Sequence, residues 1–276
     1  MIHSVKDSSL AIASPVRAPQ AADWALSHGL SSLTTQEAAE LLGTTANQVP
    51  QRLATARKRG EWMTPARGLW VPVPPEYRMW GGSPALEFID AMLAHLKTEY
   101  YLGWLSAAAV HGAAHHAPQV TQVAVSRMIR SRVIGRVRLE FFVRRNLSLL
   151  PYKLQTVRSG NVRVSTIEVT ALDLCSDIAT CGGMDNVATV IASLAEACKL
   201  SVQTIVKIGE FYSPAAVRRL GWLLENYANL PDLCTLQAYA HGCSKAASVL
   251  DPLNKPGGTL DKKWMVRINS KVEVED

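Results

Sequence analysis

Apolar residues follow a helical period over the first sixty positions, and short strand-like runs come after them. Three helices and two strands are predicted, at residues 20–28, 35–42, 45–60, 61–64 and 69–73. Thr34 and Glu37 have the T-x-x-E spacing of a capping box at the start of the second helix. The sequence Pro65–Gly68 is typical of a turn between the two strands. This order predicts a winged helix-turn-helix over residues 20–75, after a flexible tail over 1–19.

The third helix would read DNA in such a domain. Rotating residues 45–60 by about 100° each places one apolar stripe against the other helices. Polar side chains project on the far side, where Asn and Gln can bond adenine while Lys and Arg hold phosphates. With Arg67 at the turn of the wing, the predicted DNA contacts are Asn47, Gln48, Gln51, Arg52, Thr55, Lys58, Arg59 and Arg67. A solvated helix face without a function is the alternative.

Pro50 interrupts this helix pattern. Beyond the first turn, a proline removes a main-chain hydrogen bond and kinks a helix. The helix therefore either bends at Pro50 or begins near Val49, with the proline in its first turn. The second case shifts which residues face the groove.

Residues 76–84 are predicted as a linker to a larger domain over 85–276. Two helices are expected first, and then four strands rich in Val and Phe, a run of helices and a last strand. Their ranges are 85–97, 103–111, 120–126, 137–143, 153–157, 161–165, 168–180, 185–198, 202–208, 214–227, 233–244 and 264–268. Strands followed by helices, behind a small winged domain, predict an α+β protein.

Positive charge is concentrated in one stretch of this larger domain. Residues 121–163 contain ten basic residues against the single Glu140, a net of +9, whereas the whole chain has a net charge of +6. A second DNA surface, a docking surface for an acidic partner and an ordinary basic sheet edge all fit this asymmetry. The arginines singled out are Arg127, Arg130, Arg132, Arg136, Arg138, Arg144 and Arg145.

Candidate chemistry elsewhere is sparse. His111, His115 and His116, or Asp173 and Asp177, have spacings that could put metal ligands on one helix face, but no third ligand is evident. No Walker, dinucleotide or nucleophile-elbow motif occurs, so we expect no catalytic residues, bound metal or cofactor. The five cysteines suggest no disulfide framework, and neither a membrane span nor a secretory signal is evident. A cytoplasmic protein is expected.

Five segments in order resemble the AbiEi family of antitoxins and transcriptional regulators. They are RGLWVPVP, YYLGWLSAAAVHGAAHHAP, VSTIEVTALDLC, RRLGWLLE and KWMVRINSKVE. The resemblance implies a winged domain that represses the protein's own promoter, usually at inverted repeats, and a C-terminal domain needed for antitoxicity. It also implies a nucleotidyltransferase-like toxin encoded alongside, which makes docking of that toxin one use for the arginines.

An AbiEi-like antitoxin and autoregulatory repressor without catalytic activity is therefore the leading hypothesis. One alternative is a metal-dependent nucleic-acid-processing enzyme delivered by its winged domain, with Asp173, Asp177 or the histidines as ligands. Another is a DNA-binding regulator without a toxin partner.

Overall fold

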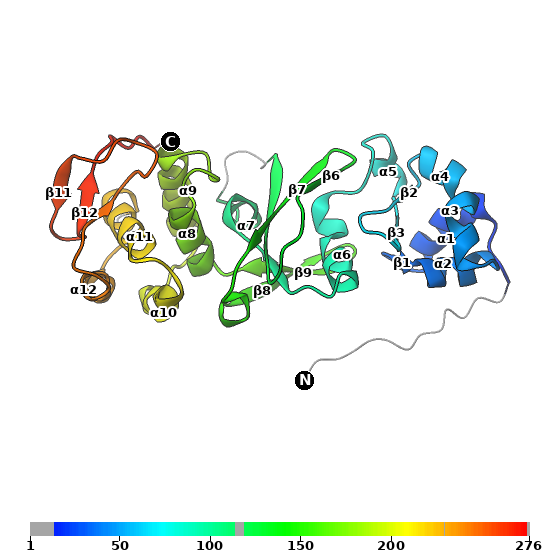
Figure 1. The fold of residues 1–276 in the computed structure, drawn as a ribbon, viewed down its shortest axis with the longest axis horizontal. Coiled ribbons are helices and arrows are strands. Elements are labelled where there is room, and N and C mark those ends of the chain that lie inside the picture. Colours follow the sequence, from blue (N-terminus) through cyan, green and yellow to red (C-terminus); the bar gives the residue numbers. More distant parts are fainter. Residues whose placement is uncertain (1–13, 114–118, 229, 275–276) are drawn as a thin grey trace. The chain divides into compact units, whose positions relative to one another are not determined.

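The chain folds as an α+β protein. The computed structural model describes residues 14–113, 119–228 and 230–274 (Figure 1). Its contacts divide the chain into two compact units. The first unit contains the described residues up to Glu99 together with 131–139 and 155–162, and the second unit contains the other described residues. This division does not follow the predicted boundary between residues 84 and 85.

The first unit begins with short helices and a small sheet, as the hydrophobic pattern predicts. Its elements are η1 (Ala18–Gln20), α1 (Ala21–Ser27), β1 (Leu33–Thr34), α2 (Thr35–Leu42), η2 (Ala46–Gln48), α3 (Val49–Arg52), α4 (Ala54–Lys58), β2 (Trp62–Met63), β3 (Leu69–Pro72), α5 (Pro75–Arg78), η3 (Ala85–Glu87), α6 (Ile89–His95) and β6 (Arg132–Ile134). The segment expected to be a tail is in part packed on this unit, because the Val16 N–H donates to the Leu41 carbonyl at 2.8 Å.

The capping box at α2 is confirmed. The Thr34 hydroxyl accepts from the Glu37 N–H at 3.2 Å, and a Glu37 carboxylate oxygen accepts from the Thr34 N–H at 2.6 Å. Gly43 ends the helix with a φ of 57°, a conformation that glycine adopts without a steric penalty. Both ends of α2 are therefore set by local sequence.

Pro50 lies in the first turn of α3, where its missing N–H costs no helical hydrogen bond. The predicted single helix over 45–60 is instead three short pieces. Leu53, at φ −91° and ψ 1°, separates α3 from α4. Of the two alternatives for the proline, the helix that begins at Val49 is the one found.

Three short strands brace these helices in the order β1-β3-β2, all antiparallel. Leu33 pairs with Trp70, and Trp62 pairs with Pro72. The rings of Trp62 and Trp70 meet edge to face, with centroids 6.5 Å apart, inside the core that the helices form. Burial of these large rings holds the small unit together, because each removes on the order of 150–250 Å² from water.

The second unit contains most of a sheet and a run of helices. Its elements are β4 (Tyr100–Leu102), α7 (Trp104–Val110), β5 (Val120–Val125), η4 (Leu147–Leu149), α8 (Ile167–Ser176), α9 (Met184–Ala197), α10 (Val202–Ile208), η5 (Gly209–Phe211), α11 (Pro214–Tyr227), α12 (Cys234–Gly242), β10 (Ser248–Val249), β11 (Thr259–Asp261) and β12 (Val266–Ile268). Three further strands have residues in both units: β7 (Val137–Val143), β8 (Tyr152–Val157) and β9 (Gly160–Ser165).

The larger sheet has the strand order β6-β7-β5-β4-β9-β8. Within the second unit, β4 is antiparallel to β5 and parallel to β9, with Leu102 opposite Val164. Five strands were missed from the sequence: β1, β4, β6, β10 and β11. Each is only two or three residues long, too short for an alternating pattern to show.

Helix α11 lies at the centre of the helical layer of the second unit. Arg218 and Arg219 are buried there, although neither has an acidic side chain bonded to it among the described residues. Arg218 donates to the Ala240 carbonyl at 3.1 Å, and Arg219 donates to the Val249 carbonyl at 3.0 Å. The guanidinium groups of both arginines therefore bind main-chain carbonyls of the protein itself. Across the described part of the chain, no helix is long and apolar enough to cross a membrane.

Candidate nucleic-acid interface

Helices α3 and α4 present one apolar face inward and one polar face to solvent. Val49, Leu53 and Ala56 are buried against the rest of the unit. The side chains predicted to contact DNA are all exposed: Asn47, Gln48, Gln51, Arg52, Thr55, Lys58, Arg59 and Arg67. Their positions are therefore compatible with the predicted reading of DNA.

Two of these side chains already have partners. The Gln48 side-chain carbonyl accepts from the Thr44 hydroxyl at 2.5 Å. Arg59 forms an ion pair with Glu61, 2.8 Å between Nε and a carboxylate oxygen. Arg57, which the rotation did not select, is also exposed beside Lys58. Its position in a run of three basic residues is the signal that could have found it.

The main chain of the turn between β2 and β3 is held within the first unit. Pro65 and Ala66 face inward, and the Arg67 carbonyl accepts from His95 Nε2 at 2.9 Å. The Thr35 N–H donates to the Gly68 carbonyl at 2.9 Å. The Arg67 side chain remains exposed, so the turn gives it a fixed base from which to extend.

The structure divides the arginine-rich stretch between the units. Arg132, Arg136 and Arg138 belong to the first unit, whereas Arg127, Arg130, Arg144 and Arg145 belong to the second. Arg132 is half-buried and donates to the Pro65 carbonyl at 3.1 Å. Five of the seven are exposed: Arg127, Arg130, Arg136, Arg138 and Arg145.

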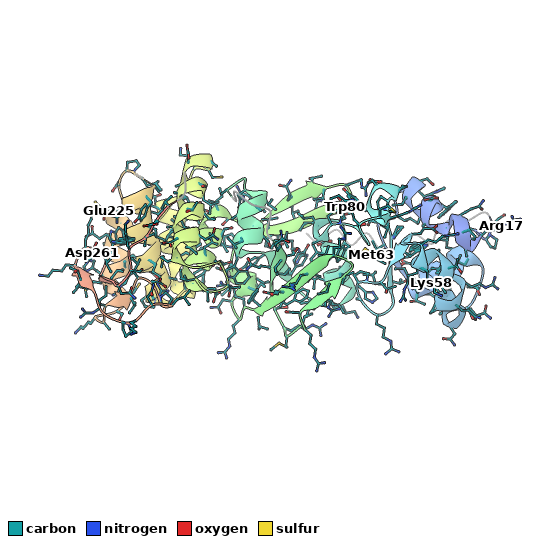
Figure 2. All side chains as sticks on the ribbon, turned by 90° about the horizontal axis from the view of Figure 1, so that it is seen from above. Arg17, Lys58, Met63, Trp80, Glu225 and Asp261 are labelled. Carbon is teal, nitrogen blue, oxygen red and sulfur yellow. The ribbon has the colours of Figure 1, made fainter. Side chains whose placement is uncertain are left out.

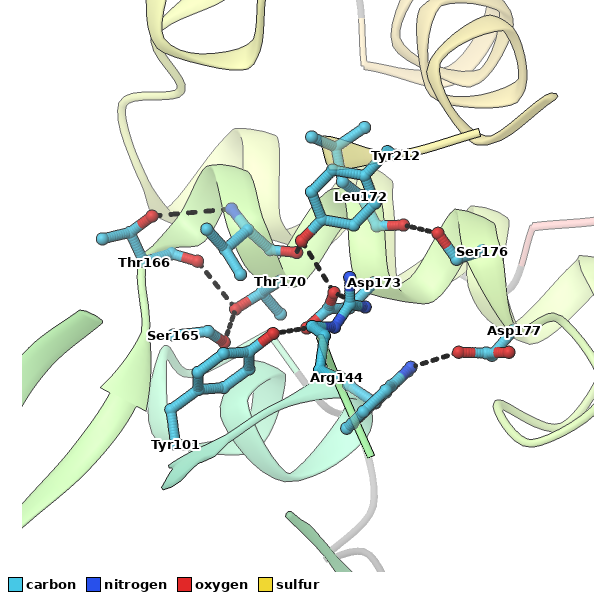
Figure 3. Close-up of polar contacts among 12 residues, drawn as sticks. Tyr101, Arg144, Ser165, Thr166, Thr170, Leu172, Asp173, Ser176, Asp177 and Tyr212 are labelled. Carbon is cyan, nitrogen blue, oxygen red and sulfur yellow. Dashed lines mark hydrogen bonds and ion pairs between the residues drawn. The ribbon is translucent and has the colours of Figure 1, made fainter. Parts of the chain in front are cut away.

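Arg144 lies in a buried polar cluster of the second unit instead of on the surface (Figure 3). Only 16% of its side chain is exposed, and it forms an ion pair with the fully buried Asp173. Its guanidinium carbon lies 4.8 Å from the Tyr212 ring centroid and 5.6 Å from that of Trp104. We therefore exclude Arg144 from the candidate surface.

Two tyrosines complete the coordination of the Asp173 carboxylate. The hydroxyl of Tyr212 donates to one of its oxygens at 2.8 Å, and that of Tyr101 donates to the other at 3.2 Å. Complete burial raises the pKa of Asp173 to about 6, while the charge of Arg144 and the two hydroxyls oppose that rise. Asp173 is ionised above that pH, and Arg144 is then its compensating charge.

The remaining candidate ligands for a metal also have other partners. Asp177 accepts from Trp104 Nε1 at 3.0 Å, and His111 Nε2 donates to the Ser165 carbonyl at 2.8 Å. Burial lowers the pKa of His111. His115 and His116 lie outside the described residues. Among the residues that are described, no three His, Cys, Asp or Glu side chains gather as a metal site.

Free thiols were expected for the cysteines, and all five are free. Cys175 and Cys181 are buried, Cys198 and Cys243 are half-buried, and Cys234 is exposed. Burial raises the pKa of Cys175 to about 12, so that thiol is protonated and unreactive at neutral pH.

This chain is similar to known proteins in fold and in sequence. A solved structure of the RV2827C protein from Mycobacterium tuberculosis is similar, with a TM-score of 0.67 and 13% identity over 91% of each chain. Identity this low shows a shared fold alone. No curated protein matches the sequence. Residues 101–226 match the family model of the AbiEi antitoxin C-terminal domain.

That match begins at β4 and ends within α11, so it contains the Arg144–Asp173 cluster and the paired arginines of α11. Three of the five resembling segments lie wholly or largely inside it. The resemblance drawn from the sequence is thus confirmed over residues 101–226, which match the AbiEi antitoxin C-terminal domain.

Proposed function

We propose that residues 20–75 form a winged helix-turn-helix with which this antitoxin binds and represses its own promoter. The observation that carries the proposal is the exposed face of α3 and α4. Residues 49–60 contain four basic residues and no acidic one, and they follow a capped helix and precede a two-stranded turn. Such a face attracts the phosphate backbone and suits the major groove.

Gln51 is the central base-reading residue of this proposal. It is exposed one residue after Pro50, in the first turn of α3, where recognition helices contact base edges. Its amide can bond an adenine bidentately, whereas the exposed Arg52 and Lys58 are suited to phosphates. Repeats of one short sequence in the promoter are the expected operator.

Gln51→Ala is expected to weaken binding to the upstream promoter by about 1–3 kcal/mol, the cost of one lost bidentate base contact. Binding to random duplex should change little, because phosphate contacts carry no sequence information. A gel shift at fixed salt measures both. Gln203→Ala, an exposed glutamine at the start of α10, is the matched control and should bind as the wild type does. Wild-type protein that binds promoter and random duplex equally well would refute repression through this face.

The antitoxin function is proposed to act on a nucleotidyltransferase-like toxin encoded beside this chain. Co-expression of the full chain is expected to restore growth of cells that express the neighbouring toxin. Gln51→Ala should restore growth equally well when both genes are under foreign promoters, because the mutation affects promoter binding only. Persistent growth arrest with wild-type antitoxin present would contradict this proposal and leave promoter binding untouched.

The exposed arginines of the two units are proposed to differ in what they bind. Arg136 and Arg138 are part of the first unit, with α3 and α4, and we assign them to DNA. Arg127, Arg130 and Arg145 are part of the second unit, within the residues that match the antitoxin domain. For those three, DNA and an acidic surface of the toxin both remain candidates as partner.

A further inference from the structure

Two large apolar side chains project into solvent from the loop after α5. Met79 is 88% exposed and Trp80 is 64% exposed. Burying such side chains would contribute on the order of 2 kcal/mol each, so adjacent exposure without a partner is unusual. We therefore expect a binding partner to cover this loop, and the neighbouring residues indicate the chemistry of that partner.

The loop is fixed between two basic segments of the same unit. Close packing at Gly60 joins it to the end of α4, because a Cβ there would lie 3.0 Å from the Arg78 carbonyl oxygen. At its other end, Gly81 packs against Gly135 in the β6–β7 turn, where a Cβ would meet the Gly81 oxygen at 2.2 Å. Within this unit α4, α5 and the β6–β7 turn succeed one another along one edge in Figure 1. Figure 2 looks down on that edge and labels Trp80 and Lys58.

The main chain of the loop is also ordered by its own hydrogen bonds. The Trp80 N–H donates to the Tyr77 carbonyl at 3.0 Å, and the Gly81 N–H donates to the Arg78 carbonyl at 3.2 Å. Met79 and Trp80 are therefore presented by a rigid turn and do not lose much backbone entropy when they bind.

The charged residues around the loop indicate which kind of partner it binds. The segments 49–60, 77–84 and 131–139 contain no acidic residue. Of their basic residues, Arg59 is paired with Glu61, Arg78 is paired with Asp23, and Arg132 donates to the Pro65 carbonyl. The others are exposed: Arg52, Arg57, Lys58, Arg136 and Arg138. An apolar tip between cations does not suit a second copy of the same basic surface, because like charges would face each other. It suits a polyanion with apolar stacked rings inside, which is duplex DNA.

The β6–β7 hairpin displays the matching face. Arg132 and Leu139 pair across it, and both point inward: Leu139 is buried and Arg132 bonds the Pro65 carbonyl. Val133 pairs with Arg138, and both are exposed. The hairpin therefore turns Arg138 toward solvent next to the loop, and Arg136 follows the turn at Gly135.

We infer that Met79 and Trp80 enter the minor groove beside the major-groove segment that α3 and α4 read, with Arg136 and Arg138 on the flanking phosphates. Apolar wedges in the minor groove are a known way to widen a protein's footprint and unstack a base step. The inference rests on the proposed promoter binding. The minor-groove contact would add to the DNA contacts predicted between Asn47 and Arg67.

Hydroxyl-radical footprinting on promoter DNA tests the inference, because the radical attacks sugars that face the minor groove. Wild-type protein is expected to protect a minor-groove segment on one flank of each half-site. The double variant Met79→Ala/Trp80→Ala should lose that protection and about tenfold in affinity, with the salt dependence unchanged because no charge is removed. Arg136→Gln/Arg138→Gln should instead lower the salt slope by about 2. Leu253→Ala, an apolar side chain that is 57% exposed in the second unit, is the control and should behave as wild type.

The outcomes separate the two levels of the hypothesis. If wild-type protein does not prefer its promoter, the proposed function fails, and this inference fails with it. If wild-type protein binds specifically but the double variant binds equally well with the same footprint, only the minor-groove contact is overturned. If the double variant instead changes the sedimentation of the free protein and leaves its footprint intact, the loop is an interface between copies and the inference is likewise overturned.

Discussion

Arg144→Met is expected to reduce the free energy of unfolding by about 3–5 kcal/mol at neutral pH, the cost of removing one partner from a buried ion pair. Asp173 is fully buried, and Arg144 is the cation bonded to its carboxylate. The variant leaves that carboxylate with two tyrosine hydroxyls and no counter-charge. Urea denaturation followed by tryptophan fluorescence measures the loss, since Trp104 lies beside the guanidinium.

The pH dependence of this loss distinguishes charge from packing. Folding raises the pKa of Asp173 to about 6, above its ordinary value of 3.8, so acidification protonates it in the folded state first. Without Arg144 that pKa should rise further, and protonation then relieves the unpaired charge. The difference between variant and wild type should therefore shrink as the pH falls from about 7 to about 5.

Arg145→Met is the matched control for Arg144→Met, because Arg145 is the next residue along the chain, carries the same charge and is exposed. It should change stability by no more than about 0.5 kcal/mol. A loss for Arg144→Met that matches that of Arg145→Met, or that stays constant with pH, would contradict the account of the buried pair.

This pair of neighbours also shows what the sequence could not reveal. Arg144 and Arg145 have the same side chain and the same local charge, so composition assigns both to one basic surface. What separates them is Asp173, 29 positions along the chain, which pairs with only one of them. Asp173 and Asp177 likewise share one local context in the sequence, because they are one helical turn apart. Distant partners gave the two carboxylates different surroundings.

Features set by neighbouring residues were predictable. The capping box of Thr34 and Glu37 needs only a spacing of three, and Gly43 needs only its own conformational freedom. Pro50 restricted the local helix to two possibilities, because its ring forbids the interior of a helix. The choice between those two required the packing of Val49 and Leu53, which the pattern alone does not order.

The apolar loop lay between these cases. Residues 76–84 resemble a linker because Pro and Gly punctuate them, and nothing in that composition distinguishes a free segment from a rigid one. Its order comes from the approach of Gly135, more than fifty residues later, and of Gly60 from the end of α4. The sequence did not single out Met79 and Trp80, because the neighbours that order this loop are brought to it only when the chain folds.

Gly221→Ala is expected to destabilise the protein by about 3 kcal/mol, although alanine is the better helix former. Gly221 lies inside α11, in the segment RRLGWLLE, where a Cβ would lie 2.1 Å from the Trp264 ring. Trp264 cannot retreat, because it is fully buried and its Nε1 donates to Glu225 at 2.6 Å. Thermal or urea unfolding measures the cost.

A double-mutant cycle shows whether the Trp264 ring is the cause. Trp264→Leu alone should cost about 3 kcal/mol or more through the cavity it leaves. In that background the added methyl has space, and Gly221→Ala should then stabilise α11 by up to about 1 kcal/mol through its helix propensity. Gly242→Ala, at the end of α12 with nothing within 4 Å of the new Cβ, is the control without a ring to meet. A cost for Gly221→Ala that is the same in both backgrounds would contradict this steric explanation, because the sign of the effect is expected to depend on the indole alone.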